Sequence, residues 1–233
     1  MRPALRELDA AQSTDRRSVR TRSALRDALA AEIEETGDLS QVTVTAVSDR
    51  AGVTRRTFYS HYRDIADLVC QIEDETVRES HELVRRIADT RLSELQESIS
   101  RFEPCPGGVE LLTYFKERGT YLSALLGDGG DPGFAEKLTC VVRDAVRDRA
   151  SEGLVPLASG AFFEYYLTFA ISAEVGVLVR WLTSGMHESV EVMARIMTAL
   201  MFVRPGDLYG RKIDFDIPAI GVGALATKGN PDD

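Results

Sequence analysis

Apolar residues recur at helical spacing through most of this 233-residue chain, and no other sequence feature constrains its fold as strongly. In the stretch 17–36, for example, Leu25, Leu29 and Ile33 repeat every fourth position, and Gly37 follows as a stop signal. The alternation expected of β-strands is scarce along the sequence. The pattern therefore predicts an all-α protein.

Capping residues and breaks predict where the other helices lie. A long helix is expected to begin at Asp64, which has Asp67 three residues on, as in a capping box. Other helices are expected at about 44–51, 55–62, 109–126, 134–151, 156–184 and 188–203. Pro104–Gly108 and Gly127–Gly133 are predicted loops.

Composition places the chain among soluble globular proteins, since 44% of its residues are hydrophobic and 28% are charged. No apolar run approaches the roughly 18 residues that a membrane span needs, and residues 1–17 lack the apolar core of a signal peptide. The chain is therefore expected in the cytoplasm, without a membrane partner.

The sequence offers no pattern for a metal, a cofactor or catalysis. Three histidines and three cysteines are scattered, without a CxxC or HExxH spacing. Neither a phosphate-binding glycine loop nor a nucleophile motif is present. We therefore expect no metal and no cofactor, and the sequence disfavours an enzyme or a lipid carrier.

Charge is distributed unevenly along the chain, although its net value is −9. One basic run contains no acid and comprises Arg16, Arg17, Arg20, Arg22 and Arg26, and a second comprises Arg55, Arg56 and Arg63. The acids lie mostly beyond residue 63. This asymmetry allows an acidic protein to bind phosphates locally.

Two short predicted helices, 44–51 and 55–62, flank a turn at Gly52, which is the geometry of a helix-turn-helix. Val47, Val53 and Phe58 are expected to form the core between them. The outward positions of the second helix are then Arg55, Arg56, Thr57, Tyr59, Ser60 and His61. Arginine can bond guanine with two hydrogen bonds, and hydroxyls can contact phosphates, so this face suits a DNA major groove.

The stretch from Thr43 to Tyr62, TVTAVSDRAGVTRRTFYSHY, resembles the DNA-binding signature of the tetracycline-repressor (TetR) family. The resemblance covers about residues 17–70 and implies that Thr43 and Thr45 meet phosphates. It implies a DNA face formed by Thr54, Arg55, Arg56, Thr57, Tyr59, Ser60 and His61. Many members carry a phosphate-binding lysine where this chain has Ile65, and Arg63 is the candidate replacement.

The remainder resembles the C-terminal domain of regulators related to the dihydroxyacetone-kinase activator, in residues 111–116, 121–126, 131–134, 176–182 and 185–186. This resemblance implies a helical effector and dimer domain. The expected organisation is a flexible arm (1–16), a three-helix helix-turn-helix head (17–63), a larger helical domain (64–203) and a tail (204–233).

Aromatic residues suggest where a small, mostly apolar effector would bind. The candidates are Tyr114, Phe163, Tyr166 and Phe169, and the tyrosines are favoured because a buried hydroxyl needs a partner. The alternative is that these side chains simply pack the core.

Two apolar stripes predict a homodimer joined through about residues 156–203. The first comprises Ile171, Val175, Leu178 and Leu182, and the second comprises Met193, Ile196 and Leu200. The alternative is that both stripes are buried within one subunit.

The predicted function is a DNA-binding transcriptional regulator, acting as a ligand-responsive repressor and as a homodimer on a palindromic operator. Two alternatives stay open. One is a transcriptional activator of the same fold, and the other is an all-helical protein-interaction module without specific DNA binding.

Overall fold

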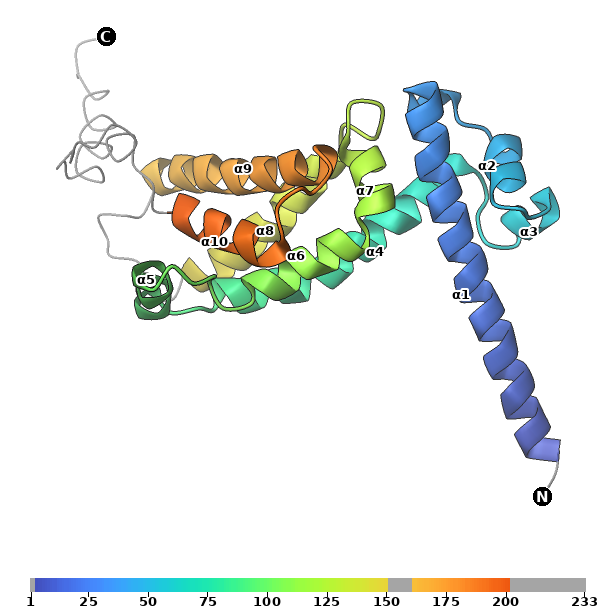
Figure 1. Cartoon of the computed structure of the whole chain (residues 1–233), viewed down its shortest axis with the longest axis horizontal. Helices are drawn as coiled ribbons and strands as arrows, with labels where there is room; N and C mark the ends of the chain where they lie inside the picture. The colour runs from blue at the N-terminus through green and yellow to red at the C-terminus, as the bar shows by residue number, and fades with distance from the viewer. Residues whose placement is uncertain (1–2, 151–160, 202–233) are drawn as a thin grey trace, which may run out of the picture. The chain divides into compact units, whose positions relative to one another are not determined.

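The computed structural model describes residues 3–150 and 161–201, with side chains for all of these except residues 3–15, Leu92 and 148–150 (Figure 1). Within these ranges the chain is helical and has no strand, which confirms the predicted all-α class. The elements are α1 (Pro3–Thr36), η1 (Leu39–Gln41), α2 (Val44–Arg50), α3 (Arg55–Tyr59), α4 (Ile65–Ala88), α5 (Leu92–Ser100), α6 (Gly108–Glu117), α7 (Gly119–Leu126), α8 (Phe134–Ala150), α9 (Ala161–Thr183) and α10 (Val190–Leu200).

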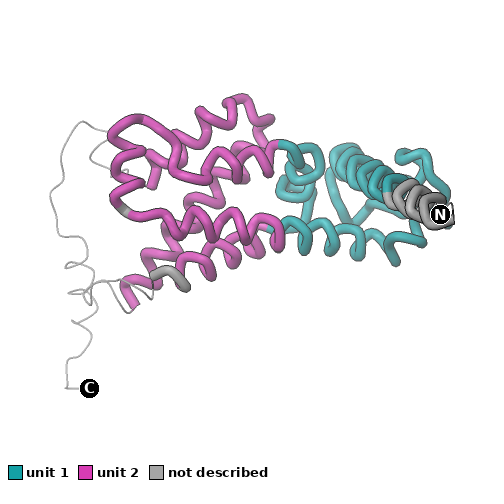
Figure 2. The backbone as a smooth tube through the Cα atoms, turned by 90° about the horizontal axis from the view of Figure 1, so that it is seen from below, with its two compact units in different colours: residues 1–76, 117–134 teal, residues 77–116, 135–233 magenta. Residues whose placement is uncertain are grey.

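The chain divides into two compact units, coloured separately in Figure 2. Unit 1 comprises residues 1–76 and 117–134. In it α1 packs against α2 and α7, and α2 packs against α3. The core of unit 1 includes Leu25, Leu29, Val47, Phe58 and Leu122, which are all fully buried.

Unit 2 comprises residues 77–116 and 135–233. Val84, Val141 and Ala145 form a buried cluster in it, with Leu111 packed against them. The backbone N–H of Cys105 donates a 2.8 Å hydrogen bond to Thr198 Oγ1, which ties the segment before α6 to α10. A Cβ on Gly108 would lie 3.0 Å from Cys105 Sγ, so the start of α6 is tightly packed.

Several predicted boundaries differ from the structure. Helix α1 continues back to Pro3, so the arm predicted to be flexible is helical over its described part. The predicted helix 109–126 is interrupted at Arg118, directly before the weak helix former Gly119. Helix α5 was not predicted. The start of the predicted helix 156–184 and the tail 204–233 lie outside the described residues.

The border between the units also differs from the predicted one at residue 63. It falls within α4, between Thr76 and Val77, and unit 1 includes α7 from further along the chain. Helix α7 belongs to this unit because it packs against α1. Arg26 of α1 adds to this packing, since its guanidinium pairs with Glu75 of α4 and lies 5.7 Å from the centre of the Tyr121 ring of α7. The head therefore needs these later residues to complete its packing.

Candidate nucleic-acid interface

The helices α2 and α3 are both capped by threonines. Thr43 Oγ1 accepts the N–H of Ala46 at 3.2 Å at the start of α2, and Thr54 Oγ1 accepts the N–H of Thr57 at 3.1 Å at the start of α3. Between the helices Gly52 has a φ of +66°, a conformation that is unfavourable for a residue with a Cβ. The predicted helix-turn-helix is therefore present.

The position of the motif is fixed by packing on one side and by ion pairs on another. Val47 of α2 and Phe58 of α3 are fully buried, whereas Val53 is half-buried. Arg50, at the end of α2, donates from Nε to Glu32 Oε1 of α1 at 2.5 Å and also pairs with Glu35. The role of Glu32 was not predicted from the sequence. The available signal in the sequence was an acid between apolar residues of α1. The structure shows that Glu32 is nearly buried there, where a charge needs a partner.

The outer side of α3 is a basic and aromatic surface. Arg55 and Arg56 are exposed, and neither has an ion pair among the described side chains. The Tyr59 side chain is 58% exposed although its ring packs edge-on against Phe58 at 5.7 Å. Burial of Phe58 therefore leaves Arg56 and Tyr59 on the solvent side of α3, and Arg55 is exposed at the first position of the helix, so an anion can reach all three.

The other predicted contact residues fall into two groups. Thr43, Thr45, Thr54 and Ser60 are exposed. Thr57 and His61 are half-buried, and the Thr57 hydroxyl lies 3.0 Å from Thr54 Oγ1, so it helps to hold the helix start. These positions place small hydroxyls beside the arginines and leave His61 at the edge of the surface.

Arg63 lies beyond α3, and its side chain is 87% exposed. Its backbone N–H donates to Asp67 at 2.8 Å, and its guanidinium bonds the same carboxylate at 3.3 Å. The backbone hydrogen bond is the main cause that lowers the pKa of Asp67. Ile65, in the position of the family's lysine, is half-buried and has no charge to offer.

The four predicted effector-pocket residues do not share one environment. Tyr114 and Phe163 are half-buried, and the Tyr114 hydroxyl oxygen is buried. Tyr166 and Phe169 are 51% and 73% exposed. The exposure of these two side chains gives no support to an enclosed pocket, and the role of all four residues stays a prediction.

The predicted dimer stripe also needs correction. Five of its residues are buried within the single chain and contribute to its own core: Ile171, Val175, Leu178, Leu182 and Met193. Ile196 and Leu200 are about 40% exposed. The helical period explains the error, because it identifies an apolar side of α9 without saying which neighbour covers it. The dimer itself stays a prediction.

Unit 2 contains a half-buried carboxyl, Glu174, that sequence reasoning missed. Burial raises the pKa of Glu174 to about 7, and burial is its only cause. Seven residues further along α9, the indole Nε1 of Trp181 is buried without a hydrogen-bond partner among the described residues. The available signal was an acid near the middle of a helix whose other charged residues lie in its first and last turns. No group of three or more metal-binding side chains occurs among the described residues.

Comparison with known proteins connects this architecture to transcriptional regulators. Residues 104–202 match the family TetR_C_8, described as "Transcriptional regulator C-terminal region". The crystal structure of a TetR transcriptional regulator from Streptococcus agalactiae superimposes with a TM-score of 0.51 at 22% identity, over 82% of this chain and 98% of that chain. No curated protein matches the sequence. The described part of the chain thus has the all-helical fold of that regulator.

Proposed function

We propose that this chain is a TetR-family transcriptional regulator that binds double-stranded DNA through α2 and α3. The observation that carries the proposal is the exposed surface of Arg55, Arg56 and Tyr59 on the second helix of a helix-turn-helix. Recognition helices present base-contacting residues near their start, where the two arginines lie. Thr43, Thr45 and Ser60 would then contact phosphates beside them.

A homodimer is part of the proposal, because one helix-turn-helix offers few base contacts. An exposed apolar surface on α9 and α10 supports it. On α9 the surface comprises Phe169, Ala173 and Gly176 at helical spacing, and on α10 it comprises Val192, Ile196 and Leu200. A Cβ on Gly176 would meet no atom within 4 Å, so a second helix has room to approach closely.

Helix α9 also has the length and composition of a membrane span. Its side that includes Leu167, Ile171 and Leu178 is buried in its own chain, so only the remaining side is free. A second copy of the chain accounts for that side without a membrane, and a cytoplasmic location follows from DNA binding. We also propose that the chain is not an enzyme and acts without a metal or a cofactor.

We further propose that a small, mostly apolar effector binds unit 2 near Tyr114 and Phe163. The effector acts only if it prefers one of two spacings of the DNA-binding heads. We propose a repressor in preference to an activator. We also propose that the chain belongs to the dihydroxyacetone-kinase regulator branch, which the resemblance of residues 111–116 and 176–182 supports. An all-helical protein-interaction module is the competing function, and it predicts no preference for any DNA sequence.

Selection from a random duplex library tests the proposal. The purified full chain should enrich a palindromic sequence whose half-sites lie about one helical turn, roughly 34–36 Å, apart. Enrichment should require Arg55, since its removal takes away a base contact. Failure to enrich any sequence at low salt, by a protein of intact helical content, would favour the interaction module.

A further inference from the structure

A second basic surface lies on α1, outside the helix-turn-helix. Arg16, Arg17 and Arg20 are exposed, and no acid occurs between Arg16 and Arg26. At 3.6 residues per turn the three arginines fall within an arc of about 100° around the helix. That arc is on the opposite side from Leu25 and Leu29, which are fully buried. We call Arg16, Arg17 and Arg20 the α1 basic face.

The two other arginines of the same run lie outside this arc. Arg26 pairs with Glu75. Arg22 is exposed, but it lies six positions after Arg16 and therefore about 120° around the helix from it, on the other side from Arg17. Among the described side chains no acid pairs with a member of the α1 basic face.

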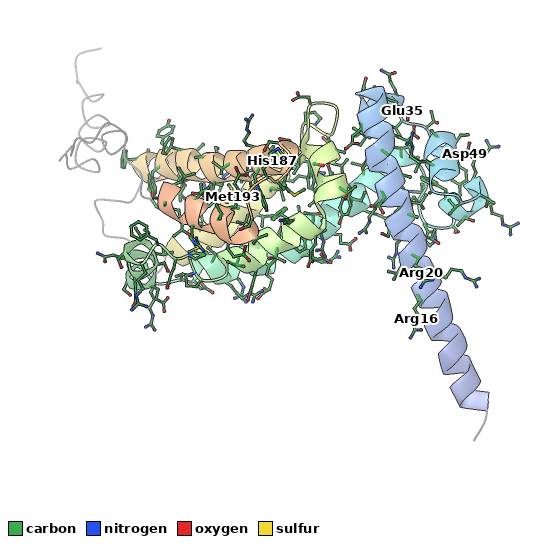
Figure 3. The ribbon with its side chains drawn as sticks, viewed as in Figure 1. Arg16, Arg20, Glu35, Asp49, His187 and Met193 are labelled. Atoms are coloured by element: carbon green, nitrogen blue, oxygen red, sulfur yellow. The ribbon has the colours of Figure 1, made fainter. Side chains whose placement is uncertain are left out.

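The α1 basic face precedes the packed part of its helix. Arg20 and Arg16 come about 7 and 14 Å along the axis before Leu25, which is the first fully buried side chain described in α1. Figure 3 shows Arg16 and Arg20 on the part of α1 that extends past α2 and α3. The helix therefore presents these guanidinium groups away from its packing partners, within the unit that holds α3.

The arrangement is unfavourable for an isolated helix. Arg16 and Arg20 are four residues apart and Arg17 and Arg20 are three apart, and like charges at these spacings repel. A polyanion would remove that repulsion. A DNA duplex fits better than a single small anion, because its charges recur every 1.7 Å or so along a rod and three guanidinium groups in a line can meet several of them.

We propose that the α1 basic face binds DNA phosphates outside the bases that α3 contacts. The inference rests on the proposed DNA-binding function and assigns it a second contact surface. Phosphate contacts contain no sequence information, so this surface adds affinity on every sequence equally. It also gives a chain of net charge −9 a local attraction for DNA.

The test compares the full-length chain with the triple variant Arg16→Ala/Arg17→Ala/Arg20→Ala by fluorescence anisotropy. The probes are a 40-base-pair random duplex and the duplex selected from the library. Each phosphate contact contributes about −0.9 to the slope of log affinity against log salt, so the slope should become shallower by about 2 to 3 on both probes. The affinity at 100 mM salt should fall by an amount on the order of 100-fold, and the ratio between the probes should not change.

Two control variants separate charge from folding. Arg78→Ala/Arg86→Ala/Arg101→Ala removes the same charge from exposed positions of unit 2 and should leave the slope unchanged. Arg16→Lys/Arg17→Lys/Arg20→Lys keeps the charge and should retain the wild-type slope. On a selected duplex trimmed to its conserved bases, the alanine variant and the wild type should bind alike.

The outcomes are distinguishable. A wild type that binds neither probe overturns both the proposed function and this inference. A wild type that binds the selected duplex, with a triple alanine variant of unchanged slope, overturns the α1 basic face alone. Loss of sequence preference in that variant, or a difference that persists on the trimmed duplex, also contradicts it, because the contact would then lie at the bases.

Discussion

Glu174 provides a quantitative test of the interior of unit 2. Burial raises its pKa to about 7 from the 4.5 of an exposed glutamate. The native state therefore keeps its proton where the unfolded chain has lost it, and stability falls as pH rises from about 4.5 to about 7. A difference of 2.5 pKa units corresponds to about 3 kcal/mol of stability, which is fully present below about pH 4.5 and lost above about pH 7.

Glu174→Gln removes the titrating group while keeping its shape. We expect the variant to unfold in urea with a free energy up to about 3 kcal/mol above that of the wild type at pH 8, and less than about 1 kcal/mol above it at pH 5. Glu103→Gln, at an exposed position of the same unit, should not change the pH dependence. All proteins are compared at one concentration, because a dimer's stability depends on it. Equal pH dependence of Glu174→Gln and wild type would refute the reasoning.

Four further substitutions test the packing and the assembly. Phe58→Ala should lower the free energy of urea unfolding by about 3–5 kcal/mol, since the ring is fully buried in unit 1, and a loss below 1 kcal/mol would contradict that packing. Gly52→Ala should lower the free energy of unfolding by about 1 kcal/mol, because alanine is strained at a φ of +66°. A Cβ there would meet no atom within 4 Å, so no steric clash adds to this cost, and an unchanged unfolding midpoint would contradict the expectation. Ile196→Asp should give monomers that keep their helical circular dichroism, whereas Leu178→Asp should unfold the chain because Leu178 is buried within it. Sedimentation equilibrium of the wild type should give twice the 25.7 kDa chain mass, and a wild-type monomer would exclude the dimer.

Local signals predicted the helix-turn-helix well. The caps at Thr43 and Thr54 and the turn at Gly52 depend on residues within a few positions of one another, and the structure has all three. The outward position of Tyr59 followed from the inward position of its neighbour Phe58. Most of the candidate DNA surface was therefore readable from the sequence.

Features that depend on distant neighbours were not readable. The apolar stripe of Ile171 and Leu178 has the same period whether it faces its own chain or a partner, and only the packed structure shows that it is buried. Likewise, no local pattern indicates that α7 packs against α1, with Arg26 joining both to α4, which places residues 117–134 in unit 1. Helix α5 has only nine residues, a length at which apolar spacing alone does not separate a helix from a loop segment.

The central claim is that the exposed arginines of α3 read DNA. It is tested most directly by the affinity of the selected duplex and of a scrambled duplex for wild type, Arg55→Ala and Tyr59→Phe at matched salt. Arg55→Ala should lose about 1–3 kcal/mol of binding free energy on the selected duplex, because one base contact is removed. On the scrambled duplex its binding free energy should hardly change. Tyr59→Phe should weaken binding by a smaller amount, since only a hydroxyl is lost. Wild-type affinity and specificity in both variants would contradict the account.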